Sequence, residues 1–179
     1  MLKKYALFLI AYLPVFFLQA DKFSSDENPK VTSWDVFGYY SYLPQTFINN
    51  DPGNKDLMKL DADCRKYEFS PFVYHFHKTK KEYHVSQYSY GMAILFAPAF
   101  FTGHIAAHFT GDEKDGYSPP YQYSMLIWYM IYIFISLLFF FKVIARLFSL
   151  SIAFVLLCVL LYGTNYYFYS IYGAGMPHL

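Results

Sequence analysis

Two long apolar segments near the end of the chain constrain its fold more than any other feature. Residues 121–141 and residues 148–169 contain no charged side chain. A helix of about 20 apolar residues is long enough to cross the hydrocarbon of a bilayer. The short connection between the two segments carries Lys142 and Arg146. The pattern predicts a hairpin of transmembrane helices whose turn lies in the cytoplasm, because cytoplasmic connections are rich in Lys and Arg.

The composition agrees with a membrane protein. Of the 179 residues, 56% are apolar and 15% are charged, and the chain contains 20 Tyr and 20 Phe. Soluble domains carry roughly 25% charged residues. The net charge of +1 and the scattered Lys and Arg argue against a nucleic-acid partner. The predicted fold class is a mainly α polytopic membrane protein with about three transmembrane helices, one re-entrant or interfacial helix and a small mixed outer loop region.

The N-terminal residues 1–20 allow two interpretations. Lys3 and Lys4 precede an apolar run that only Pro14 interrupts. The first interpretation is a transmembrane helix, or signal anchor, whose N-terminus the lysines hold in the cytoplasm. The second is a signal peptide that is removed. Both place the following residues on the outer side of the membrane.

Residues 21–87 form the one long polar region and are expected to be an outer loop region. The pattern indicates a short helix over 56–66 and a small hairpin in which strands over 68–74 and 82–88 flank a turn at 78–81. Such a region is too polar to build a large core alone, so it should rest against the membrane part.

Residues 88–120 are expected to be a re-entrant or interfacial helix followed by an acidic loop. The segment 89–109 is apolar, but Pro98, His104 and His108 lie within it. If Lys142 and Arg146 are cytoplasmic, this segment does not cross the membrane fully. Residues 121–179 then form the transmembrane hairpin with an outer aromatic end.

This arrangement places four chemically interesting residues on the outer side. They are Asp35, Asp115, Asn165 and His178. Asp35 stands in the aromatic stretch 34–44, close after the first apolar segment. A carboxylate held near a bilayer by aromatic side chains could take a proton or bind a metal. The competing interpretation is an interfacial turn whose Trp and Tyr side chains sit at headgroup depth.

Other motifs carry weaker signals. Asp61-Ala62-Asp63 has the form of a metal-binding pair, but the preferred interpretation is a solvated helix face, because the tripeptide is common by chance. His75, His77 and His84 lack a further ligand at a spacing that zinc requires. Cys64 and Cys158 lie in segments of different character, and no disulfide is expected between them.

Several of these segments resemble one known family. The stretches 35–44, 90–101, 115–122 and 163–167, together with His104, are similar in order to bacterial integral-membrane glycosyltransferases of the C-type fold. These enzymes are related to dolichyl-phosphate-mannose protein mannosyltransferases. The resemblance covers most of the chain through short motifs, and it matches the N-terminal portion of such enzymes.

The resemblance implies transfer of a sugar from a polyprenyl-phosphate donor to an acceptor on the outer face of the bacterial inner membrane. Asp35 would be the catalytic base. Some relatives use a divalent cation, Mg²⁺ or Mn²⁺, and Asp35 and Asp115 would then be its ligands. The predicted substrate-binding residues are Tyr39, Tyr40, Tyr42, His104, Asn165 and His178. The three tyrosines could stack on a sugar face, but interfacial anchoring is the preferred interpretation of their role.

The family has more transmembrane helices than this chain. The chain is therefore expected to be incomplete alone and to assemble with further transmembrane helices or subunits, besides membrane lipid. The alternative is a small non-enzymatic membrane protein that anchors or binds a partner.

Overall fold

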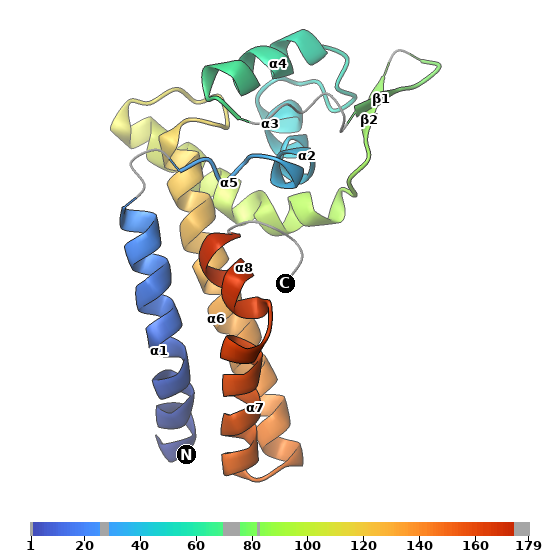
Figure 1. Ribbon diagram of the computed structural model, residues 1–179. Helices are drawn as coiled ribbons and strands as arrows, with labels where there is room; N and C mark the ends of the chain where they lie inside the picture. The colour runs from blue at the N-terminus through green and yellow to red at the C-terminus, as the bar shows by residue number, and fades with distance from the viewer. Residues whose placement is uncertain (1, 26–28, 70–75, 82, 174–179) are drawn as a thin grey trace. The chain divides into compact units, whose positions relative to one another are not determined.

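The computed structural model describes residues 2–25, 29–69, 76–81 and 83–173. Helices dominate this part of the chain, which confirms the predicted mainly α fold. The elements in chain order are α1 (Leu2–Ser24), α2 (Asp35–Tyr40), α3 (Tyr42–Phe47), α4 (Leu57–Lys66), β1 (Phe76–Lys78), β2 (His84–Ser86), α5 (Gly91–Thr110), α6 (Pro119–Leu147), α7 (Leu150–Gly163) and α8 (Tyr166–Tyr172) (Figure 1).

Three described helices are long and apolar enough to cross a membrane, namely α1, α5 and α6. The α7 and α8 helices pass the same test together, but they meet at a bend of 60°. The segment 148–169, predicted as one helix, is thus broken in two. The break has a local cause, because Thr164 is extended and its Oγ1 accepts a hydrogen bond from the Tyr166 amide at 3.1 Å.

The structure divides into two compact units. The first unit comprises Met1–Glu27 and Trp128–Leu179, and the second comprises Asn28–Ile127. The α6 helix contributes its first turns to the second unit and the remainder to the first. The units differ from the segments expected from the sequence, because helices distant in the chain pack together within the first unit.

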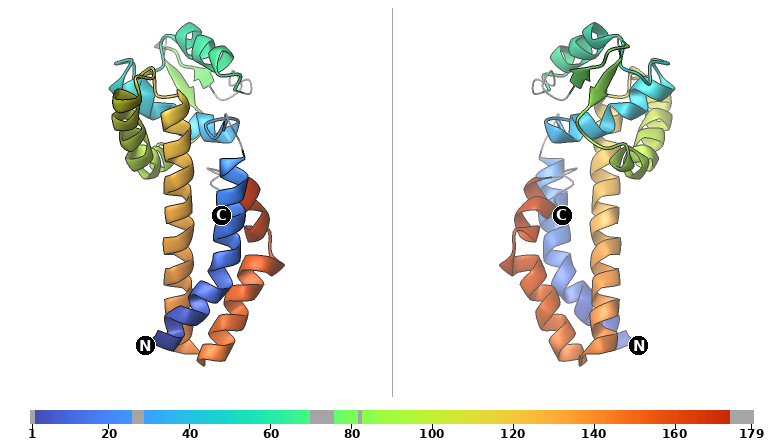
Figure 2. Two further views of the ribbon diagram at one scale, coloured as in Figure 1. Left: turned by 90° about the vertical axis from the view of Figure 1, so that its left-hand side faces the viewer. Right: turned by 90° about the vertical axis from the view of Figure 1, so that its right-hand side faces the viewer.

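The first unit is a bundle in which α1, α7 and the later turns of α6 lie side by side (Figures 1 and 2). Its core comes from one stripe on each helix, spaced by three or four residues as a helix face requires. The stripes are Phe8, Ala11, Tyr12 and Val15 on α1, Tyr129, Ile133, Leu137 and Phe141 on α6, and Ala153, Leu157 and Leu161 on α7.

Polar contacts between helices add specificity to this bundle. The Tyr162 hydroxyl donates to the Ala11 carbonyl at 2.6 Å. The Gln19 side chain is fully buried and donates from Nε2 to the Ser170 carbonyl at 2.7 Å. This contact ties α1 to α8, and α1 continues as a helix to Ser24, beyond the predicted end at residue 20.

The second unit is built around buried aromatic rings. Tyr117 stacks on Phe37 with ring centroids 5.6 Å apart, and Tyr40 packs edge-on against Phe100 at 6.2 Å. Aromatic pairs of this geometry add to the free energy gained by burying their surface. The rings fix α2 against α5 and the loop that precedes α6, although the region carries many polar residues.

The α5 helix is continuous through Pro98. Within the second unit it lies across the first turns of α6 (Figures 1 and 2). Gly103 stands at the crossing, where an added Cβ would lie 2.8 Å from the Tyr121 Cα. The Ser124 hydroxyl donates to the Ala99 carbonyl at 2.7 Å beside this crossing.

The polar region has the predicted small helix and hairpin. Asp56 caps α4 by accepting from the Lys59 amide at 3.0 Å. The β1 and β2 strands pair antiparallel with Phe76 opposite Ser86. The prediction of a first strand over 68–74 was wrong where it is described, since residues 68 and 69 are not a strand and β1 begins at Phe76. Residues 70–75, and hence His75, lie outside the described part.

Candidate functional site

Asp35 is the first residue of α2, and an unusual backbone places it there. The preceding residue, Trp34, has φ 51° and ψ −134°. A bulky residue with a positive φ is strained, and such strain persists only where surrounding structure enforces it. The Trp34 side chain is 59% exposed, while Asp35 is half-buried. The chain therefore presents a carboxylate and a large exposed indole side by side.

A tyrosine from a distant part of the chain holds the Asp35 carboxylate. The Tyr88 hydroxyl donates to Asp35 Oδ1. The Tyr88 ring lies against Gly38, where an added Cβ would be 2.1 Å from the ring. Asp35 and Gly38 share a face of α2 because they are three residues apart. The glycine thus makes room for the ring that reaches the carboxylate.

Neighbouring side chains fix Tyr88 in turn. The Tyr42 hydroxyl donates to the Tyr88 carbonyl at 2.9 Å, and the Tyr88 amide donates to Ser86 Oγ at 3.2 Å. The Tyr39 ring lies 4.5 Å from the Tyr88 ring, centroid to centroid. Tyr39 and Tyr42 are half-buried, and both contact Tyr88, the partner of Asp35.

Tyr40 has a different environment from its two neighbours. Its side chain is fully buried, and its hydroxyl donates to the Gly116 carbonyl at 2.7 Å. Burial raises the pKa of Tyr40 well above its ordinary value. Tyr40, one of the predicted substrate-binding residues, therefore presents no surface to a ligand in this structure. The residue instead ties α2 to the loop that carries Asp115.

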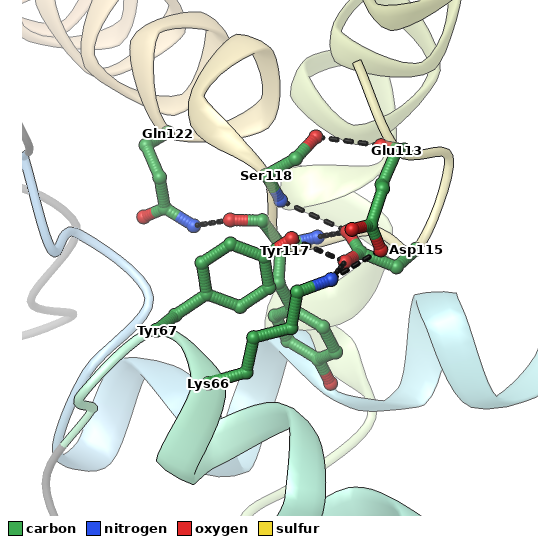
Figure 3. A network of polar contacts seen from close by, with 7 residues as sticks. All are labelled: Lys66, Tyr67, Glu113, Asp115, Tyr117, Ser118 and Gln122. Carbon is green, nitrogen blue, oxygen red and sulfur yellow. Dashed lines mark hydrogen bonds and ion pairs between the residues drawn. The ribbon is translucent and has the colours of Figure 1, made fainter.

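Asp115 is the centre of a second polar network (Figure 3). Its Oδ1 accepts from the amides of Tyr117 at 2.8 Å and Ser118 at 2.9 Å. Its Oδ2 accepts from the Tyr67 hydroxyl and lies 3.4 Å from Lys66 Nζ. The same ammonium pairs with Glu113. Both oxygens of Asp115 are thus engaged, and the carboxylate closes the turn before α6.

This network changes the titration of its members. Burial and the hydrogen bond to Asp115 raise the pKa of Tyr67. Desolvation lowers the pKa of Lys66, but the contacts with Glu113, Tyr67 and Asp115 together raise it by a larger amount. The net effect is a raised pKa. Lys66 stays charged at all physiological pH values and neutralises part of the acidic loop.

Asp63 faces the network from α4. Burial, and then the charge of Asp115, raise the pKa of Asp63 from 3.8 to about 6, although Lys59 and Lys66 oppose the shift. Asp61, its partner in the Asp-x-Asp motif, pairs instead with Arg65 at 2.7 Å. The two carboxylates therefore have separate partners, because residues two apart point to different sides of a helix.

We expect Asp63→Asn to stabilise the protein above pH 6. In the folded state Asp63 holds a proton up to about pH 6, whereas an unfolded Asp releases it near pH 3.9. Folding stability therefore falls as the pH rises from about 4 to 6. Because solvent screens a partly exposed group, the gain on removing the charge is of order 1 kcal/mol.

The measurement is thermal unfolding of the detergent-solubilised protein at pH 4 and pH 7.5. Asp61→Asn is the matched control. It removes a carboxylate from the same helix, and that carboxylate forms only a surface ion pair with Arg65. A stabilisation by Asp63→Asn of equal size at both pH values would contradict the raised pKa.

A pocket of about 340 Å³ opens beside the Asp115 network. It combines aromatic rings, two ammonium groups, one amide and the Glu68 carboxylate, which pairs with Lys30 at 2.8 Å. Its lining residues are Pro29, Lys30, Lys66, Tyr67, Glu68, Phe69, Tyr117, Pro119 and Gln122. The Gln122 amide is fixed, since Nε2 donates to the Tyr117 carbonyl at 2.9 Å and to Thr32 Oγ1 at 2.7 Å. Asp35 does not line this pocket.

The remaining predicted site residues lie apart. His104, on α5, contacts the Tyr121 hydroxyl through Nδ1 at 2.6 Å. Asn165 is exposed at the α7–α8 break in the first unit. His178 lies outside the described residues. Asp35 and Asp115 both belong to the second unit, but they have different partners. Among the described residues, no three His, Cys, Asp or Glu side chains gather as a metal site would require.

Sequence reasoning missed the residues that hold the two carboxylates. Tyr88 lies 53 residues after Asp35, while Lys66 and Tyr67 lie 49 and 48 residues before Asp115. No local pattern marks these pairings. The single sequence signal is Gly38, three residues after Asp35, which leaves space for a large side chain on that face of α2.

Comparison of the chain with protein-family models, curated proteins and solved structures found no match. The resemblance to membrane glycosyltransferases therefore stays a prediction from short motifs.

Proposed function

We propose that the chain is part of a membrane glycosyltransferase that moves a sugar from a polyprenyl-phosphate donor to an acceptor on the outer face of a bacterial inner membrane. One observation carries the proposal beyond the resemblance. Asp35 follows a strained Trp34, and its carboxylate is held by a Tyr88 hydroxyl that fits only because residue 38 is glycine. Strained backbone and oriented carboxylates are typical of reaction sites.

The proposed chemistry needs one base. The Asp35 carboxylate takes the proton of an acceptor hydroxyl, and the acceptor oxygen forms a bond to the anomeric carbon of the sugar. The bond from that carbon to the phosphate oxygen breaks, and the lipid phosphate leaves with the electron pair. Tyr88, by donating to Oδ1, would orient the carboxylate toward the acceptor hydroxyl.

Aromatic rings next to Asp35 suit the sugar. Trp34 is exposed, and Tyr39 and Tyr42 are half-buried, so each can offer a ring face to the apolar side of a pyranose. His104, Asn165 and His178 stay in the proposal as donor contacts, carried by the resemblance alone.

A divalent cation does not fit Asp115 as the residue is arranged. Both of its oxygens already accept hydrogen bonds, and the Lys66 ammonium stands 3.4 Å from Oδ2. A nearby ammonium repels Mg²⁺ or Mn²⁺, which seek several carboxylate oxygens. We therefore assign Asp115 to the closure of its loop and derive no step through a metal.

Donor turnover tests the proposal. Membranes containing the chain would be incubated with polyprenyl-phosphate-mannose and, separately, polyprenyl-phosphate-glucose carrying radiolabelled sugars. We expect the release of free polyprenyl phosphate to exceed that of membranes lacking the chain for one of the two donors. Release no greater than that of membranes lacking the chain, with both donors, would favour the alternative proposal, a non-enzymatic membrane protein that binds a partner.

The proposed topology makes a separate prediction about α5. If α5 lies at the outer surface without crossing, positions before and after it are on the same side. We expect Lys80→Cys and Asp112→Cys, each in a Cys64→Ala and Cys158→Ala background, to react with an impermeant thiol reagent on intact cells. Arg146→Cys should react only after permeabilisation, because the α6–α7 turn would be cytoplasmic.

Labelling of Lys80→Cys without Asp112→Cys would make α5 a full span and would separate Asp35 from Asp115 across the membrane. That result would contradict the hydrogen bond from Tyr40 to the Gly116 carbonyl, which ties α2 to the loop of Asp115, whatever the outcome of the donor assay.

A further inference from the structure

The break between α7 and α8 lies in an exposed stretch of the chain. The α7 helix has 14 residues, so it is about 21 Å long. It starts one turn after Arg146, whose guanidinium belongs at the headgroups. The hydrocarbon of a bilayer is about 30 Å thick. If α7 runs across the bilayer, its end at Gly163 lies inside the hydrocarbon.

The last carbonyls of α7 are only partly satisfied. The Leu160 carbonyl accepts from Thr164 Oγ1 at 2.7 Å. The amides that follow do not donate to the remaining carbonyls of α7. The Tyr166 amide donates to Thr164 Oγ1, and the Tyr167 amide donates to the Thr164 carbonyl. Within the described part of the chain, the carbonyls of residues 161–163 accept no hydrogen bond. Irregular backbone at membrane depth occurs only where protein or water covers it.

The open side of the break continues an apolar stripe along α7. The stripe consists of Ile152, Val155, Val159 and Gly163, and the first three side chains are 47%, 57% and 52% exposed. Gly163 joins this face, because a Cβ added to it would lie 3.6 Å from Val159 Cγ1. A glycine at the end of such a stripe lets another helix approach closely.

Asn165 supplies the complementary group. Its side chain is exposed next to the free carbonyls, and it makes no hydrogen bond to the described residues. The carboxamide offers two donor hydrogens. In two copies related by a two-fold axis along the membrane normal, the breaks lie at the same depth. Each Asn165 then faces the free carbonyls of the other copy.

We propose that this chain forms a homodimer through the face of α7 that runs from Ile152 to Gly163, together with Asn165 in the break that follows. Val155 and Val159 pack against their counterparts, Gly163 allows close approach, and Asn165 of each copy donates to the partner's carbonyls. The inference rests on the first unit alone and holds whether or not the second unit transfers a sugar.

Disulfide crosslinking in membranes tests the interface. In the Cys158→Ala background, Val159→Cys is expected to form a dimer on mild oxidation. Phe139→Cys is the matched control, since Phe139 is 62% exposed on α6 in the same unit and belongs to no part of the proposed face. Crosslinking at residue 139 that equals crosslinking at residue 159 would indicate random collision and would overturn the proposal.

Mass measurement of the detergent-solubilised protein gives the second test. We expect a dimer, and we expect Asn165→Leu to weaken it at least tenfold, whereas Asn165→Gln keeps the donors and retains it. Gly163→Leu should also weaken the dimer by preventing close approach. A monomeric native chain, or a dimer that Asn165→Leu leaves intact, would show that lipid, water or a different protein covers the break.

Discussion

Asp35→Asn is expected to lower sugar transfer about 1,000-fold, the range in which a positioned general base contributes to catalysis. Asparagine has the size of aspartate, and its carbonyl oxygen can still accept from the Tyr88 hydroxyl. The hydrogen bond between residue 35 of α2 and Tyr88 is therefore kept. The amide cannot take a proton from an acceptor at neutral pH. The expected loss therefore falls on the chemical step and not on folding or membrane insertion.

Two measurements separate these effects. Initial rates of polyprenyl-phosphate release give the catalytic loss, and thermal unfolding in detergent should change by no more than a few degrees. Asp61→Asn serves as the control, because it removes a carboxylate of the same unit that pairs with Arg65 on the surface. Transfer that persists in Asp35→Asn at the native rate would remove Asp35 from the chemistry, even if turnover itself is real.

The parts of the fold that depend on local composition were predictable. Apolar segments without charge mark α1 and α6, because a bilayer selects for length and hydrophobicity alone. Asp56 and the turn before it predict the start of α4, because Asp is a favoured N-cap residue. The break after Gly163 was not predicted. Thr164 and Asn165 are only two polar residues in a long apolar segment, and neither residue type by itself ends a helix.

The candidate site was predictable only in its carboxylates. The sequence cannot distinguish Tyr40 from Tyr39 and Tyr42, because the short run has no period long enough to define a face. Tertiary packing decides the matter by burying Tyr40 against Phe100 and Tyr117. The same holds for Lys66, which reaches Glu113 and Asp115 across 47 and 49 residues of chain.

Gly38→Ala tests the geometry of the Asp35 site through its most crowded contact. Alanine normally favours a helix over glycine by about 1 kcal/mol. Here the new Cβ would stand 2.1 Å from Cδ2 and 2.6 Å from Cε2 of the Tyr88 ring. The ring cannot move easily, because Tyr42 and Ser86 hold its backbone. We expect a net loss of about 1 to 3 kcal/mol in unfolding free energy, as for other overpacked sites.

Removing the obstacle should reverse the stability loss but not the functional loss. In Gly38→Ala combined with Tyr88→Ala, the Cβ meets no ring, so the double variant should be less destabilised than the sum of the two single changes. Sugar transfer should stay low, since no hydroxyl then orients Asp35. Gly91→Ala is the matched control, because a Cβ at this helical glycine meets nothing within 4 Å. Additive losses in the double variant would mean that Tyr88 does not lie over Gly38, and the oriented carboxylate on which the proposed function rests would lose its structural basis.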